Sequence, residues 1–171
     1  IVGKIGETPQ MFSVHWGLWA FSGVRSDLQT SRRHAEQMLA LARQQPDLLV
    51  EAYMALGGAY YWSGAWAQAR HHLQRGLEVY DATRHRANML LYGQDPGVAC
   101  LGHLAQALWM LGYPEQARQH AQDGIALARS QAHPYSLAYA LIFAATSHLM
   151  RRQHREANAF GGQRVERDAG E

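Results

Sequence analysis

Apolar residues recur at intervals of three or four along much of this chain, the spacing that places them on one face of an α-helix. The pattern is clearest between Tyr53 and Tyr80, where it is interrupted once, at Ser63-Gly64. The two runs therefore predict two helices joined by a tight turn. Small residues stand where two antiparallel helices would touch, at Gly57, Ala69 and Gly76. Such a hairpin cannot bury its apolar face alone, so it needs stacked neighbours.

Proline and glycine divide the rest of the chain in the same way. The five prolines all fall at inferred helix starts, where the missing backbone N–H is not needed, at positions 9, 46, 96, 114 and 134. Breaks between helices are expected near residues 23–26, 44–47, 63–65, 81–95, 112–114 and 130–134. Asp47 and Asp95 are predicted to cap the helices that follow them, and an extra helical turn is expected over Ala87–Leu91. No period-two pattern indicates a β-strand, so the chain is predicted to be all-α.

These elements group into about four helical hairpins. The small residue early in each second helix recurs at intervals of 38, 48 and 40 residues, as Ser31, Ala69, Ala117 and Ala157. A tetratricopeptide (TPR) repeat has a period of about 34 residues, with an aromatic residue, then leucine and glycine, then tyrosine, then alanine. The chain resembles that pattern with longer helices or loops, which implies a right-handed TPR-like α-solenoid. The predicted repeat domain covers residues 1–160, with units at about 8–45, 47–81, 95–130 and 134–160, and residues 161–171 are predicted to be a disordered polar tail.

Four stretches taken together resemble a more specific family. They are Trp16-Gly17-Leu18-Trp19, Tyr92-Gly93-Gln94-Asp95-Pro96-Gly97, Leu111-Gly112-Tyr113-Pro114-Glu115-Gln116-Ala117 and His133-Pro134-Tyr135-Ser136-Leu137-Ala138. They are similar to the C-terminal helical-repeat region of large bacterial signalling proteins that combine a class III adenylate/guanylate cyclase domain, a P-loop ATPase module and TPR-like repeats. This chain has no cyclase domain and no GxxxxGK(S/T) phosphate-binding loop. The catalytic and nucleotide-binding residues of that family therefore have no positions here to map onto.

Composition narrows the class of protein. The formal net charge is only +2, with arginines scattered among acidic residues, so a nucleic-acid partner is not predicted. No apolar run approaches the ~18 residues of a membrane span. The single cysteine, Cys100, excludes an internal disulfide and a paired-cysteine metal site, and it fits a reducing, cytoplasmic setting. The chain begins at Ile1 without an initiator methionine, as expected of a piece of a longer protein.

No constellation of residues predicts bond chemistry, a metal site or a cofactor. None of the ten histidines are three or four residues apart, the spacing that a helical metal site needs. Asp81 and His85 could form an acid/base pair, but a solvated helix pair beside a loop is the preferred interpretation. Cys100 has no neighbouring base and is interpreted as a buried small hydrophobe, and Ser136 as part of a helix start.

The more informative prediction concerns the concave face, which the first helix of each TPR hairpin lines. TPR spacing places an aromatic and apolar set there: Trp16, Met54, Tyr61, Trp62, Gln106, Trp109, Met110, Tyr139 and Ile142. For each of these residues, burial in the core is the competing interpretation, above all for Trp16 and Trp109. Almost no Lys or Arg projects from this face, so a clamp for acidic peptides is not predicted. An apolar helix or extended segment is the expected partner.

Three hypotheses of function follow. The first is a protein–protein interaction module of a bacterial signalling or regulatory protein, with an apolar peptide or helix in its groove. The second is a regulatory sensor that binds a small ligand there and controls attached cyclase or ATPase domains. The third, a cryptic enzyme, has no supporting constellation of residues. The module is therefore predicted not to be an enzyme.

Overall fold

The computed structural model describes residues 9–147 and 149–150. Every regular element among these residues is a helix, and no strand is present in them. The predicted all-α class is therefore confirmed. The partner helix of the fourth predicted unit, after residue 150, and the predicted polar tail, residues 161–171, lie outside the described residues.

The helices follow the proline and glycine punctuation closely. They are α1 (Pro9–Val24), α2 (Leu28–Ala42), the short 3-10 helix η1 (Pro46–Leu48), α3 (Leu49–Trp62), α4 (Trp66–Val79), α5 (Arg86–Tyr92), α6 (Pro96–Met110) and α7 (Pro114–Ser130). Residues 134–147 and 149–150 are also helical and are called the C-terminal helical segment below. The predicted extra turn over Ala87–Leu91 is confirmed as α5, and the turns after α3 and α6 use glycines with positive φ, Gly64 and Gly112.

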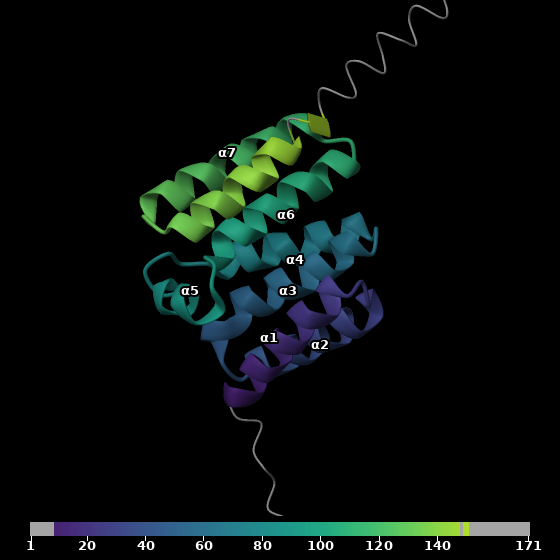
Figure 1. Cartoon of the computed structure of the whole chain (residues 1–171), viewed down its shortest axis with the longest axis vertical. Coiled ribbons are helices and arrows are strands. Elements are labelled where there is room, and N and C mark those ends of the chain that lie inside the picture. The colour runs from purple at the N-terminus through teal and green to yellow at the C-terminus, as the bar shows by residue number, and fades with distance from the viewer. Residues whose placement is uncertain (1–8, 148, 151–171) are drawn as a thin grey trace, which may run out of the picture.

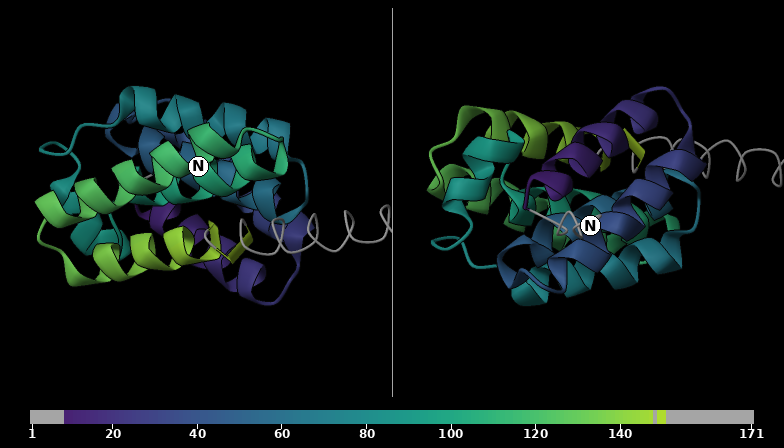
Figure 2. Two further views of the ribbon diagram at one scale, coloured as in Figure 1. Left: turned by 90° about the horizontal axis from the view of Figure 1, so that it is seen from above. Right: turned by 90° about the horizontal axis from the view of Figure 1, so that it is seen from below.

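Consecutive helices pack in pairs, and the pairs are stacked along the long axis of the molecule (Figure 1). Within the pairs, α1 packs on α2, α3 on α4, and α6 on α7. Between pairs, α2 contacts α3, and α6 contacts both α3 and α4. Seen along the stack, α4 and the C-terminal helical segment lie on opposite sides (Figure 2, left).

The starts of α6 and α3 show which of the two predicted N-caps is formed. The carboxylate of Asp95 accepts a hydrogen bond from the backbone N–H of Val98 at 2.8 Å, so the predicted cap of α6 is confirmed. The predicted cap at Asp47 was wrong, because Pro46 opens a 3-10 turn and moves the N-cap of α3 to Leu48. The carboxylate of Asp47 instead pairs with Arg84 across the loop.

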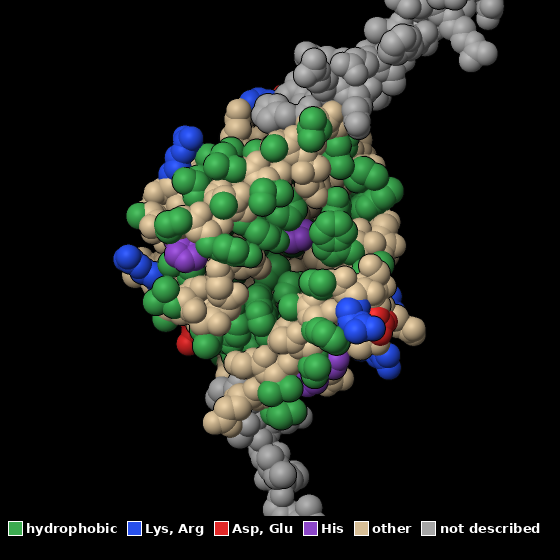
Figure 3. All heavy atoms as spheres, in the orientation of Figure 1, with side chains coloured by type: hydrophobic (Ala, Val, Ile, Leu, Met, Phe, Trp, Pro, Cys, Tyr) green, Lys and Arg blue, Asp and Glu red, His purple; other side chains and the backbone are tan. Residues whose placement is uncertain are grey.

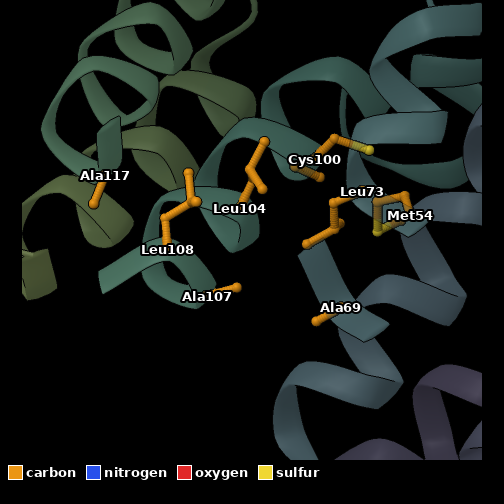
Figure 4. Close-up of a cluster of buried hydrophobic side chains, with 9 residues drawn as sticks. Met54, Ala69, Leu73, Cys100, Leu104, Ala107, Leu108 and Ala117 are labelled. Carbon is orange, nitrogen blue, oxygen red and sulfur yellow. The ribbon is translucent and has the colours of Figure 1, made fainter. Parts of the chain in front are cut away.

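The core lies between the paired helices, and small residues let them approach closely. A Cβ atom added at Gly57 of α3 would lie 2.5 Å from Cγ of Leu73 on α4, far inside van der Waals contact. At Gly76, such an atom would lie 3.0 Å from Sγ of Cys100. The predicted close approach at these glycines is therefore confirmed. The largest buried cluster (Figure 4) consists of Met54, Ala69, Leu73, Ala99, Cys100, Leu104, Ala107, Leu108 and Ala117.

Candidate functional site

A wide groove opens on the side of the molecule formed by the first helices. It encloses about 680 Å³, and the space-filling view shows a hollow lined by hydrophobic side chains with histidine at its upper edge (Figure 3). Its walls come from α1, the start of α2, α3, the end of α5 and the C-terminal helical segment. The lining residues are Trp16, Trp19, Ala20, Gly23, Val24, Ser26, Leu28, Ser31, Ala59, Trp62, Tyr92, Gln94, Tyr135 and Tyr139.

One wall is a cluster of aromatic rings from α1 and α5. Trp16 and Trp19, one helical turn apart, have ring centroids 5.1 Å from each other. Tyr92, at the end of α5, places its ring 4.7 Å from that of Trp16. Tilted and edge-on ring pairs at this distance are favourable beyond the area that they bury. This wall is therefore a packed and preformed surface.

The opposite wall belongs to the C-terminal helical segment. The rings of Tyr135 and Tyr139 lie 6.3 Å apart, and Tyr139 lies 4.8 Å from Phe143. The groove lies between α1, which carries Trp16, and the C-terminal helical segment, which carries Tyr139. It therefore exists only when that segment is held in place.

A buried hydrogen-bond network holds that segment against the start of α6. The backbone N–H of Asp95 donates to the hydroxyl of Ser136 at 3.0 Å, and the N–H of Ser136 donates to Nδ1 of His133 at 3.3 Å. The hydroxyl of Tyr80 donates to the carboxylate of Asp95 at 2.8 Å. Ser136 is fully buried, so its hydroxyl is not accessible as a nucleophile. The network anchors the start of the helix, in agreement with the sequence prediction for Ser136.

The floor of the groove is formed by α3, with α6 behind it. Trp62 is 60% exposed and Ala59 lies beside it. Behind them lies His103 of α6, which is only 3% exposed. Its imidazole is surrounded by rings, with centroids 5.9 Å from Tyr61, 6.4 Å from Trp62, 6.2 Å from Tyr139 and 4.7 Å from Phe143. Burial lowers the pKa of His103 to about 4, so the imidazole is neutral at physiological pH.

The structure brings together three of the predicted groove residues, Trp16, Trp62 and Tyr139. Tyr61 lies directly beneath, half-buried against Trp62 and His103.

The other predicted groove residues lie elsewhere. Met54 and Gln106 are buried in the core, because their positions face neighbouring helices instead of the groove. Trp109 lines a separate small cavity against α7. Met110, at the end of α6, and Ile142 are exposed outside the groove lining.

The aromatic and imidazole rings that sequence reasoning missed are Trp19, Tyr92 and Tyr135 on the groove lining and His103 behind its floor. Two of them carried a usable signal, since Trp19 is three residues after Trp16 and Tyr135 is four before Tyr139, which places each pair on one helix face. The place of Tyr92 and His103 depends on contacts between distant segments and gave no such signal.

The groove carries no charge on its lining. Among the fourteen lining residues named above there is no Lys, Arg, Asp or Glu, and the polar members are serine, glutamine and tyrosine. This lining therefore offers no cationic side chain that could clamp an acidic peptide. An anion placed here would lose part of its hydration without gaining a cationic partner.

The remaining titratable candidates are structural. Cys100 is free and fully buried, and burial raises the pKa of its thiol, which confirms its interpretation as a small core residue. The prediction of a solvated Asp81–His85 pair was wrong for the histidine. His85 is buried, and its Nδ1 lies 2.8 Å from the carbonyl oxygen of Asp81 and 3.0 Å from its N. The backbone of the loop folds over the ring, which stacks on Tyr80.

Glu51 of α3 is the most unusual buried group. It is almost fully buried, and neither carboxylate oxygen has a hydrogen-bond partner. Loss of hydration raises the pKa of Glu51 to about 7, although its own backbone N–H and the nearby amide of Asn88 oppose this shift. Within the described residues, no group of three His, Cys, Asp or Glu side chains is placed to hold a metal ion.

No described helix has the length and apolar character needed to cross a membrane. No protein-family model matches the chain. An uncharacterized protein of Rhizobium meliloti (strain 1021) is 24% identical over 138 residues, which is 80% of this chain. The match spans only 13% of that protein's length, so the relative is several times longer than the chain.

Proposed function

We propose that this chain is a TPR-like right-handed α-solenoid and a protein–protein interaction module, which binds an apolar peptide or helix in the groove between α1, α3 and the C-terminal helical segment. The module has no catalytic role. In the cell it belongs to a larger bacterial signalling or regulatory protein of the cytoplasm, whose other parts supply the activity. The observation that carries the proposal is the uncharged, aromatic groove of about 680 Å³ with a largely exposed tryptophan on its floor.

The groove has the properties of a binding surface for three reasons. Soluble proteins rarely expose contiguous apolar patches unless they bind something. Tryptophan and tyrosine are the side chains that most often dominate binding energy, and six tryptophan and tyrosine side chains line this groove. The stacked helix pairs offer a rigid frame, as in helical-repeat proteins that bind peptides on one face. The match to a part of a much longer bacterial protein supports the role of a module within a larger chain.

A second function is favoured by the size of the groove. A volume of about 680 Å³ lies within the range of roughly 300–1,000 Å³ that is typical of small-molecule sites. The module would then be a sensor that binds an uncharged ligand and controls attached domains. The groove can be saturated with an apolar peptide and a small apolar ligand then added. If the ligand displaces the peptide, both bind to the same surface. If both stay bound, they occupy two separate sites.

The test uses a host peptide, capped at both ends, that forms an uncharged amphipathic helix with leucine and phenylalanine on one face. Calorimetric titration is expected to show binding of the host peptide and no binding of an acidic peptide of equal length. Trp62→Ala is expected to weaken binding more than tenfold, because truncation of an aromatic anchor costs about 2 kcal/mol or more. Its melting temperature should change by only a few degrees, because the side chain is 60% exposed.

Leu90→Ala on α5 is the matched control. Leu90 is 77% exposed and lies outside the groove, so this variant should keep both its affinity and its stability. A large fall in the melting temperature of Trp62→Ala would place that ring in the core and contradict the proposal. Equal affinity of the wild type for the host peptide and for the acidic peptide would also contradict the proposal.

A further inference from the structure

We propose that the outer face of α1 is the junction with a further helix pair of the parent protein, which precedes the pair of α1 and α2, and that the second helix of that pair packs on it. The face consists of Met11, Val14, Leu18 and Phe21 and is called the α1 stripe below. It is a different surface from the groove. The inference rests on the proposed function only in taking the chain as part of a larger protein.

The α1 stripe is apolar and exposed. Its four residues follow one another at intervals of three, four and three along α1, which places them on one face of the helix, and all four are exposed. None of them lines the groove. Seen from this end of the stack, no described helix lies in front of α1 (Figure 2, right). A row of large apolar side chains on a helix without charged residues is unusual for an inert surface.

The register of the repeats shows that the same face is buried in every later pair. The intervals of 38, 48 and 40 residues that relate the second helices also align Leu18 of α1 with Leu56 of α3, Leu104 of α6 and Ala144 of the C-terminal helical segment. Leu18 is 42% exposed, whereas the three later residues are 3%, 0% and 6% exposed. The α1 stripe therefore has the position of an interface without the helix that covers that position elsewhere.

The covering helix in each later pair is the second helix of the pair before it. The buried clusters join Leu56 to Met38 of α2, Leu104 to Leu73 of α4, and Ala144 to Ala121 of α7.

The position of Val14 repeats this relation. The same intervals align it with Ala52, Cys100 and Ala140, which are all buried. These residues pack in the same clusters as Met38 of α2, Leu73 of α4 and Ala128 of α7, respectively. Two neighbouring positions thus agree that a preceding second helix is the occupant of this face.

The size of the stripe residues defines the chemistry of that helix. Val14 and Phe21 are larger than Ala52 and Ala59, the residues that align with them on α3. A helix that packs over them therefore needs small residues on its apolar face, alanine or glycine, and charged residues on its other face, as the second helices of this chain have. The stripe of a second copy has no small residue to offer. The greater length of the bacterial relative is consistent with further helix pairs outside this chain.

The first test compares the 171-residue chain with the full-length parent protein. Leu18→Cys places a thiol on the α1 stripe, and Leu90→Cys on α5, at an exposed position away from the stripe, is the matched control. Reaction with a maleimide is followed by mass spectrometry of the peptide that carries the new thiol. In the parent protein, Leu18→Cys should react at least about tenfold more slowly than in the chain alone, because a covered thiol reacts only after local opening. Leu90→Cys should react at the same rate in both.

The second test identifies what covers the stripe. The photo-crosslinking residue p-benzoylphenylalanine replaces Leu18 in the parent protein. The cross-link is expected within the same molecule, to a segment less than one repeat length upstream of Met11, because α2 lies at that place relative to α3. A cross-link to a second copy of the protein, or to a distant domain of the same molecule, would overturn the inference.

The outcomes separate this inference from the proposed function. Equal reaction rates of Leu18→Cys in the chain and in the parent protein, or equal slowing of both thiols, would overturn the junction on α1. The groove would remain a peptide site in that case, because the groove and the α1 stripe share no residue. Failure of the wild type to bind the host peptide, with Leu18 covered and cross-linked as expected, would contradict the proposed function and leave the junction standing.

Discussion

The first and second helices of each pair differ sharply in charge. The first helices, α1, α3 and α6, together with the C-terminal helical segment, contain one Asp, Glu, Lys or Arg residue among their described positions, Glu51. The second helices carry the other charges of the pairs: Arg32, Arg33 and Glu36 on α2, Arg70, Arg75 and Glu78 on α4, and Glu115, Arg118, Asp123 and Arg129 on α7. The second helices therefore form the solvated side of the molecule.

The difference shows that the first helices are surrounded by protein on more than one side. α6, for example, contacts α3, α4 and α7, and thirteen of its fifteen residues are buried. A helix that is apolar all round is expected in such a position. Part of the surface of the first helices that no other helix covers contributes to the groove. The groove lacks charged side chains because these helices lack them. The contrast between core helices and solvated helices can be tested by substitution.

The largest effect is expected for Leu104→Ala on α6. Leu104 is fully buried at the centre of the largest cluster, and a cavity at such a site costs about 2–5 kcal/mol. Urea denaturation followed by circular dichroism measures the loss. Leu77→Ala on α4, a half-buried position, should cost clearly less. Equal losses would contradict the view that the first helices form the core.

The next effect concerns the single charge on the first helices. Glu51 has a pKa of about 7 in the folded state against 4.5 in the unfolded chain, so the folded state binds the proton more tightly. The stability of the wild type should therefore fall as the pH rises from about 4.5 to 7, and remain lower above 7. Glu51→Gln, which resembles the protonated form, should be more stable than the wild type at pH 8 by about 2–3 kcal/mol.

Melting curves between pH 4 and 8 check this prediction, because the advantage of Glu51→Gln should shrink towards pH 4. Parallel pH profiles of variant and wild type would show that the carboxylate is ionised without cost. Glu51 would then no longer be an exception among the first helices.

A smaller loss is expected for Gly57→Ala, which tests the close approach of α3 and α4. The new methyl would lie 2.5 Å from Leu73, and the resulting shift should cost about 1–2 kcal/mol after the gain in helix propensity. Gly17→Ala, with no atom within 4 Å of the added carbon, should instead be neutral or slightly stabilising. Chemical denaturation of the two variants side by side gives the comparison, and a stabilised Gly57→Ala would contradict the packing.

The smallest effect is expected on the solvated side. Glu36 of α2 pairs with Arg32 at 3.5 Å, and the two side chains are 47% and 41% exposed. Glu36→Gln should change stability by less than about 0.5 kcal/mol, because exposed ion pairs contribute little. Melting temperatures at low and high salt measure it. A loss of stability as large as that of Leu104→Ala would contradict the view that the charged face of the second helices is simply solvated.

Much of the fold was predictable because it depends on local signals. The five prolines all stand at inferred helix starts, Asp95 caps α6 as predicted, and Gly57 and Gly76 mark the close contacts between helices. The exception, Asp47, shows the limit of a local rule. A residue type that favours a cap does not fix where the helix begins when a proline one position earlier opens a 3-10 turn.

The candidate site was predicted only in part. Trp16, Trp62 and Tyr139 were expected on the groove and line it, whereas Met54 and Gln106 were expected there and are buried. On a helix that is apolar all round, the sequence pattern does not distinguish the face that meets the core from the face that meets solvent. This is why some of the residues expected on the groove line it and others are buried in the core.

The sequence by itself determined the helices, their order and breaks, the apolar character of the first helices and the absence of charge on their common surface. These features depend on residues close together in the chain. Only the tertiary structure decided which aromatic rings meet across the groove, since Trp16, Tyr92 and Tyr139 come from segments far apart in sequence. It also decided that His103 stands behind the floor with its Nδ1 bonded to Ala99, because the surroundings of a buried side chain are set by helices packed against it and not by its neighbours in the chain.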